Sequence, residues 1–88
     1  MHSIQQKNEF AARLHNSLNK NSTSAKGAVA LARLFNAQQP DVAGISVQTA
    51  HKWLTGRAIP AYEKMRALAE CLDIDFQWLR DGVYPVRL

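Results

Sequence analysis

Apolar residues in this chain recur at spacings of three and four, the spacing that places side chains on one face of an α-helix. The pattern appears in successive segments: Phe10, Ala11, Leu14 and Leu18; Ala28, Leu31, Ala32 and Phe35; Ala50, Trp53 and Leu54; Met65, Leu68, Ala69 and Leu72. No segment shows the period-two alternation of a half-buried strand. The sequence therefore predicts an all-α fold, and its 88 residues suffice for one domain and not for two.

Turn and capping residues divide this pattern into five expected helices. The first should start at Glu9, the second should span about residues 25–36 and the third about residues 46–55, while Pro60 should open the fourth and residues 76–81 should form the fifth. The expected caps are Ser22, Thr23 or Ser24 and Asn36 for the second helix, Ser46 and Gly56 for the third, and Asp75 and Gly82 for the fifth. We therefore expect an N-terminal arm over residues 1–8, a domain over residues 9–82 and a tail over residues 83–88.

Residue types that carry catalysis or bind metals are few and scattered. Cys71 is the only cysteine, which excludes an internal disulfide and a cysteine-based zinc site, and its setting favours a half-buried packing thiol. The histidines His2, His15 and His51 are isolated, and His15 is expected on the exposed side of the first helix. Neither a glycine-rich phosphate loop nor a glycine-framed serine occurs. We expect no enzyme activity, cofactor, metal or small-molecule ligand.

The chain shows no signal for a membrane or for secretion. It has no run of 18 or more apolar residues, and its first 20 residues lack the apolar core of a signal peptide. These observations predict a soluble, cytoplasmic protein that does not bind a membrane.

Charge is distributed unevenly along the sequence, although the net charge is only +4. Between Phe10 and Tyr62 the only acid is Asp41, whereas the bases there are Arg13, Lys20, Lys26, Arg33, Lys52 and Arg57. From Glu63 onward acids and bases nearly balance. This distribution suits one face that binds a polyanion, and it suits equally a solvated cationic surface, so charge alone leaves both open.

The third expected helix has two different faces. Ala50, Trp53 and Leu54 form a stripe for burial, whereas the other face carries hydrogen-bonding side chains without negative charge, namely Gln48, His51, Lys52 and Thr55. Glutamine can pair with adenine and lysine with guanine in a major groove, and side chains at the helix end can hold phosphates. The alternative is an ordinary solvated helix face. A short helix in a basic setting, preceded by a helix with the small residue Ala32, favours nucleic-acid binding.

At these residues the sequence resembles a known family. The run ISVQTAHKWLTGRAIP, followed by KMRALAECLDIDFQWLRDG, is similar to lambda-repressor-like (Cro/repressor, XRE-type) helix-turn-helix regulators, especially small phage and prophage members. The resemblance covers roughly residues 10–82, and its most specific part is Trp53-Leu54 with Gly56 and Pro60. It implies a compact five-helix domain that binds double-stranded DNA and regulates transcription as a repressor.

The resemblance also implies roles for individual residues. Val47, Gln48 and Lys52 match positions that meet base edges, and His51 borders them. The remaining expected DNA contacts are to phosphates: Lys26, Ser46 (also the helix cap), Thr49, Thr55 and Arg57. The start of the second helix, residues 24–28, matches a segment whose amides face a phosphate, because a helix N-terminus favours an anion.

Two features depart from the family pattern. The family turn usually has three or four residues, with glycine where Asn36 stands, but here residues 37–45 intervene between the helices. This insertion puts the standard docking geometry in question. The second departure is Asp73, where glycine is common, and Asp tolerates the left-handed conformation that this position requires.

The expected partners are DNA and a second copy of the chain. We expect a homodimer on a pseudo-palindromic operator, with the last helix and residues 83–88 as candidates for the dimer interface. The rival is a helix-turn-helix module that binds a protein, such as an antitoxin or a phage adaptor. Convergence of Lys26, Lys52 and Arg57 beside Gln48 would favour DNA, whereas an apolar patch across that face would favour a protein partner.

Overall fold

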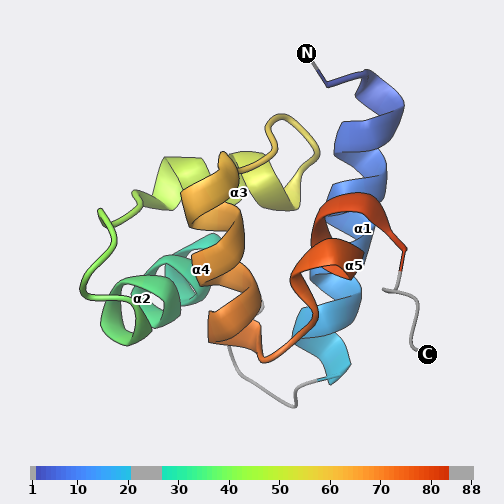
Figure 1. The fold of residues 1–88 in the computed structure, drawn as a ribbon. Helices are drawn as coiled ribbons and strands as arrows, with labels where there is room; N and C mark the ends of the chain where they lie inside the picture. The colour runs from blue at the N-terminus through green and yellow to red at the C-terminus, as the bar shows by residue number, and fades with distance from the viewer. Residues whose placement is uncertain (1, 21–26, 84–88) are drawn as a thin grey trace, which may run out of the picture.

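The computed structural model describes residues 2–20 and 27–83, and within these residues it contains five α-helices and no strand (Figure 1). The helices are α1 (Ile4–Lys20), α2 (Ala28–Gln38), α3 (Val47–Leu54), α4 (Tyr62–Leu72) and α5 (Phe76–Asp81). The all-α prediction is confirmed. None of the helices in this part of the chain is both long and apolar enough to cross a bilayer.

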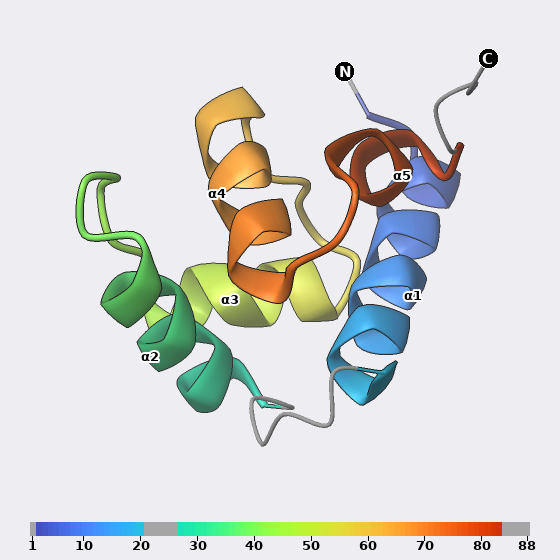
Figure 2. The same cartoon turned by 60° about the horizontal axis from the view of Figure 1, so that its bottom comes forward.

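Helix α3 lies across the middle of the bundle. It packs against α2 on one side and α1 on the other, while α4 contacts α2 and α5, and α5 also contacts α1. Figure 2 shows α3 running between α2 and α1 with α4 standing over it. Every helix contributes to the buried core, which includes Phe10, Leu14, Leu18, Leu31, Phe35, Trp53, Met65, Leu68 and Leu79. The apolar stripes seen in the sequence thus meet in one core.

Helix α1 begins at Ile4, so residues 4–8 are helical and do not form the expected arm. Ser3 and Gln6 exchange hydrogen bonds: the Gln6 N–H donates to Ser3 Oγ (3.0 Å) and the Ser3 N–H donates to Gln6 Oε1 (2.8 Å). This is a capping box, which satisfies two free amides at a helix start. Residues 4–8 are largely exposed, so their sequence lacks the apolar spacing of a buried helix face. The Ser-x-x-Gln spacing at Ser3 and Gln6 is the sequence feature that could have predicted this helix start.

Helix α2 ends two residues later than the sequence predicts. Asn36 lies inside the helix and not at a left-handed end, and Gln39 is the C-cap, with its N–H donating to Phe35 O (2.9 Å). The side chain of Asn36 is bonded to the backbone of Ile45 and does not serve as a local cap. The helix begins at Ala28, while the predicted caps Ser22, Thr23 and Ser24 lie outside the described residues.

The other helix ends follow the sequence more closely. Ser46 caps α3 by accepting from the Thr49 N–H (3.1 Å), and Asp75 caps α5 by accepting from the Trp78 N–H (2.8 Å). Asp73 is left-handed with φ 54°, as expected. The left-handed Gly56 and Gly82 follow α3 and α5, as predicted. Helix α4 differs, because it starts at Tyr62, two residues after Pro60.

The delayed start of α4 has a packing reason. Pro60 precedes the N-cap Ala61, and both Pro60 and Met65 are buried. Pro60 lies directly before the N-cap and Met65 four residues after it, the two positions at which apolar side chains can form a hydrophobic staple. Proline therefore sets the approach to the helix here and does not occupy its first turn.

Candidate nucleic-acid interface

The buried face of α3 anchors it to the bundle. Ala50, Trp53 and Leu54 are buried, with exposed fractions of 0%, 3% and 9%. The Trp53 ring meets the Phe35 ring of α2 edge to face, with centroids 6.1 Å apart. Because Ala50 adds so little bulk, the helix can lie close to its neighbours. This face fixes the position of whatever the opposite face presents.

The opposite face of α3 opens onto solvent. Val47, Gln48, His51 and Lys52 are all exposed. These side chains line one surface hollow of about 460 Å³, together with Arg57 and with Ala28 from the first turn of α2. The structure thus brings together all four predicted base-reading residues and one predicted phosphate-binding residue. Within residues 2–20 and 27–83, neither Gln48 nor Lys52 is covered by another segment.

Of the three predicted phosphate-binding residues with hydroxyl groups, Ser46 is the N-cap of α3, Thr55 is its C-cap and Thr49 lies in its first turn. The Ser46 hydroxyl donates to Thr49 Oγ1 (3.1 Å), and the Thr55 hydroxyl donates to His51 O (2.7 Å). Ser46 and Thr55 are exposed and Thr49 is half-buried, but none of the three lines the hollow. Their contact with phosphate stays a prediction.

The start of α2 borders the same hollow through Ala28. Its N-cap is Gly27, which provides no side-chain hydrogen bond to the first turn. Among the described residues, no side-chain cap occupies the amides of this turn, and the N-terminus of a helix favours an anion. Lys26, which was expected to bind phosphate beside them, lies outside the described residues.

Helix α1 holds the far end of α3, which the sequence did not predict. The Nε2 atom of His15 is 2.9 Å from Leu54 O, within hydrogen-bonding distance. Gly56 follows with φ 73°, and a Cβ added to it would lie 2.5 Å from Asn8 Oδ1, so only glycine fits. His15 is exposed as expected, but its bond spans 39 residues of sequence and has no local signal.

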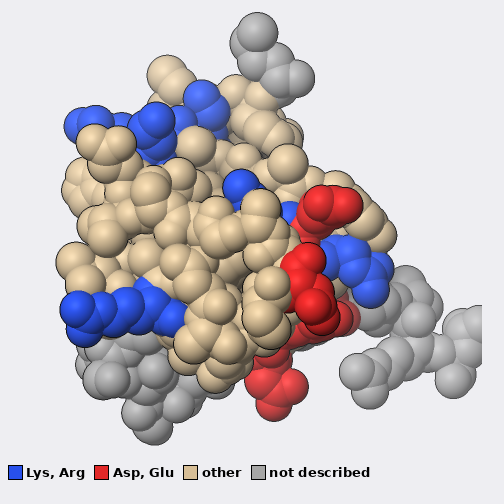
Figure 3. Space-filling model, turned by 90° about the vertical axis from the view of Figure 1, so that its left-hand side faces the viewer, with Lys and Arg blue, Asp and Glu red and all other residues tan. Residues whose placement is uncertain are grey.

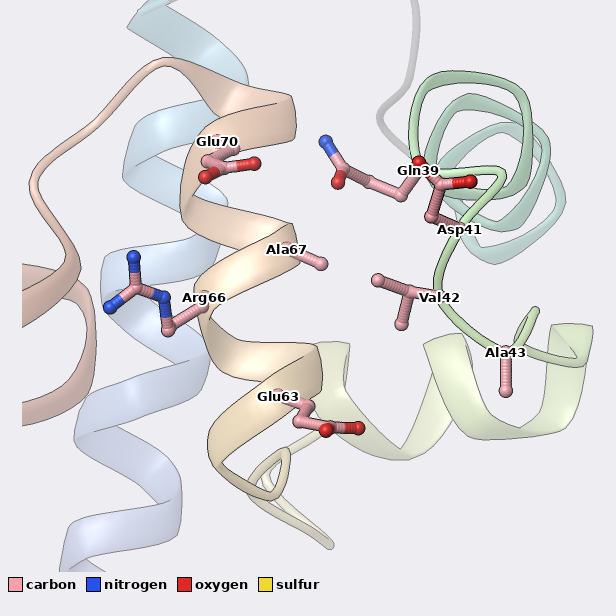
Figure 4. A pocket seen from close by; sticks show the side chains of 8 residues that line it. All are labelled: Gln39, Asp41, Val42, Ala43, Glu63, Arg66, Ala67 and Glu70. Atoms are coloured by element: carbon pink, nitrogen blue, oxygen red, sulfur yellow. The ribbon is translucent and has the colours of Figure 1, made fainter.

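Charges separate between two hollows. A second hollow of about 290 Å³ lies between the α2–α3 connection and α4, and its acidic lining residues are Asp41, Glu63 and Glu70, with Arg66 among them (Figure 4). In the face shown by Figure 3, acidic side chains gather at one side and most basic side chains lie toward the other. The described residues that line the hollow beside α3 include Lys52 and Arg57 and no acid. A polyanion is therefore favoured at α3 and disfavoured at the second hollow.

The chemistry of the described residues gives no sign of a metal or thiol site. No group of three or more His, Cys, Asp or Glu residues in the described part of the chain is placed to hold a metal ion. Cys71 is buried, and burial raises the pKa of its thiol, which keeps it protonated at neutral pH. This confirms its reading as a packing residue.

Comparison with known families gives one match. Residues 41–79 match a helix-turn-helix family model, a segment that includes α3, α4 and the first part of α5. No curated protein and no solved structure matches the chain. The match begins inside the α2–α3 connection, and the structure adds α2 packed against α3. Residues 41–79 of the chain are thus similar to helix-turn-helix proteins, whose second helix enters the DNA major groove in the members that bind DNA.

Proposed function

We propose that the protein is a sequence-specific transcriptional repressor, of the type found in phages and prophages, that inserts α3 into the major groove of an operator. The observation that carries this proposal is the convergence of Val47, Gln48, His51, Lys52 and Arg57 at one open hollow. The buried indole of Trp53 holds the helix, and its polar side projects to solvent. A recognition helix needs both properties.

Each side chain in the hollow suits a specific part of duplex DNA. The Gln48 carboxamide can bond adenine at two points, the Lys52 ammonium can donate to guanine O6 and N7, and Val47 can contact a thymine methyl group. Arg57, just beyond the helix, suits a backbone phosphate, as does the N-terminus of α2, where Gly27 supplies no side-chain cap. Phosphate contacts would fix the docking, and base contacts would select the sequence.

The same arrangement favours DNA over a protein partner. Lys52 and Arg57 lie with Gln48 at the hollow, and among the described residues that line it Val47 is the only large apolar side chain. Protein-binding surfaces are typically centred on several apolar or aromatic side chains. We therefore place the antitoxin or adaptor function second.

We further propose that the protein acts as a homodimer in the cytoplasm and represses by occupying the operator. A two-fold dimer presents two recognition helices to successive major grooves, about 34 Å apart. Val83, which follows α5 and is 57% exposed, is an apolar residue available to such an interface. Sedimentation of the 88-residue chain and of a chain truncated after Gly82 tests whether the tail belongs to the dimer interface. The same oligomeric state for both chains would exclude the tail from the interface.

Selection of bound duplexes from a random library at near-physiological salt tests the proposed function. The expected result is a pseudo-palindromic motif with half-sites about one helical turn apart. The double variant Q48A/K52A should fail to enrich this motif, while the control variant Q38A, which changes an exposed glutamine of α2 outside the hollow, should recover it. Absence of any enriched motif for the parent protein would overturn the proposal.

A further inference from the structure

The last residue of the connection between α2 and α3 is bonded at both backbone groups by one side chain of α2. The Ile45 N–H donates to Asn36 Oδ1 (2.8 Å), and Asn36 Nδ2 donates to Ile45 O (3.0 Å). One carboxamide of α2 thus satisfies both backbone polar groups of the residue that precedes Ser46, the N-cap of α3. Ile45 itself is 6% exposed, so its side chain is fixed in the core as well. We call this pair of bonds the Asn36 clamp.

The rest of the connection is shaped around the clamp. A Cβ added to Gly44 would lie 3.0 Å from Asn36 Oδ1, so glycine leaves the room that the carboxamide occupies. Val42 packs against the core, and Figure 4 shows its side chain directed toward Ala67 of α4. The Val42 N–H also donates to Gln39 O (3.2 Å). The inserted residues therefore form an ordered link between the two helices.

We propose that Asn36 is a positioning residue for DNA recognition: the Asn36 clamp fixes where α3 begins relative to α2. This inference rests on the proposed function. Ala28 of α2 and Gln48 of α3 border the same hollow, so a duplex docked there must meet both helices at once. A long connection could let α3 shift relative to α2, and two hydrogen bonds about 3 Å long at its last residue prevent this.

Specificity is the property that should depend on the clamp. Base contacts by Gln48 and Lys52 require the helix at a defined depth and rotation, because paired hydrogen bonds tolerate little displacement. Attraction between Lys52 or Arg57 and the phosphates depends far less on exact placement. Loss of the clamp should therefore weaken binding to the preferred sequence more than binding to other sequences.

The test uses two variants that disturb the clamp from opposite sides, N36A and G44A, with N16A as control because Asn16 is another exposed asparagine inside a helix. For each protein, the dissociation constants for the selected duplex and for a scrambled duplex of equal length are measured. Both clamp variants should lose discrimination by the equivalent of one base contact, about 5- to 150-fold. Affinity for the scrambled duplex and its salt dependence should stay as in the parent, and N16A should match the parent throughout.

Hydrogen exchange of the Ile45 amide reports the clamp without DNA. This amide should exchange faster in N36A and stay protected in N16A. Parental discrimination in N36A despite fast Ile45 exchange would overturn the proposal, as would an equal loss of affinity for both duplexes together with a lower unfolding midpoint, which indicates a purely structural role. If the parent itself discriminates no sequence, the proposed function fails first, and the exchange data separate that result from failure of the clamp.

Discussion

Lys52 and Trp53 are neighbours in the sequence, yet they lie on opposite faces of α3 and in different surroundings. Lys52 is exposed at an open hollow whose described lining residues include no acid, whereas Trp53 is 3% exposed and packs on Phe35. On the buried face the requirement is volume and shape, because core side chains are close-packed. On the open face the requirement is hydrogen-bonding chemistry and positive charge. One short helix thus separates the residues that hold it from the residues that act.

This separation makes stability and binding independently measurable. A change on the buried face should lower the free energy of unfolding, and binding should fall only because less protein is folded. A change on the open face should leave unfolding unaltered and alter affinity or sequence preference. The distinction between the two faces would be wrong if a change on the open face lowered stability, or if a change on the buried face altered sequence preference without lowering stability.

The largest effect is expected on the buried face, for W53A. Removing the indole leaves a cavity under α3 and should lower the free energy of unfolding by about 3–5 kcal/mol, a large part of the stability of a domain this size. Urea unfolding followed by circular dichroism measures the change. A midpoint close to that of the parent would show that the indole does not anchor α3.

On the open face the largest effect should come from Q48A. Loss of a paired base contact should reduce discrimination at one operator position by about 1–3 kcal/mol, without a change in the urea midpoint. Competition binding with single-base operator variants measures this loss, and Q38A is the control on α2. Equal discrimination in Q48A and Q38A would remove Gln48 from the base-reading set.

A smaller and non-selective effect is expected for R57A. If Arg57 neutralises one phosphate, its removal should weaken binding to all sequences alike and should lower the slope of log affinity against log salt by about 0.9. The matched control is R66A, which removes an arginine from the acidic hollow and should leave the slope unchanged. Equal slopes in R57A and R66A would contradict the phosphate contact.

The smallest effect is expected for H15A, which removes the bond to Leu54 O at the end of α3. A typical hydrogen bond contributes about 0.5–1.5 kcal/mol, and the low end applies because His15 is exposed and water can replace it. H51A provides the contrast, since His51 lies on the open face of α3 and should change DNA binding and not unfolding. A loss of stability in H51A as large as that in H15A would contradict the expectation that the open face of α3 does not contribute to stability.

Much of the fold could be predicted because its signals are local. The apolar stripe of each helix, the caps Ser46 and Asp75, and the left-handed Asp73 depend on residues within one or two turns of each other. The same holds for the grouping of Val47, Gln48, His51 and Lys52, which follows from helical spacing alone. The start of α1 was missed although its Ser3-x-x-Gln6 signal is also local.

The amino-acid sequence alone determined that five amphipathic helices form and which face of α3 carries hydrogen-bonding side chains, because both follow from periodicity along one helix. Only the tertiary structure decided that Asn36 bonds Ile45 and stays within α2, that His15 reaches Leu54, and that Arg57 joins the hollow beside α3. These contacts depend on how separate helices pack. Packing is set by the whole core, so no local pattern in the sequence records it.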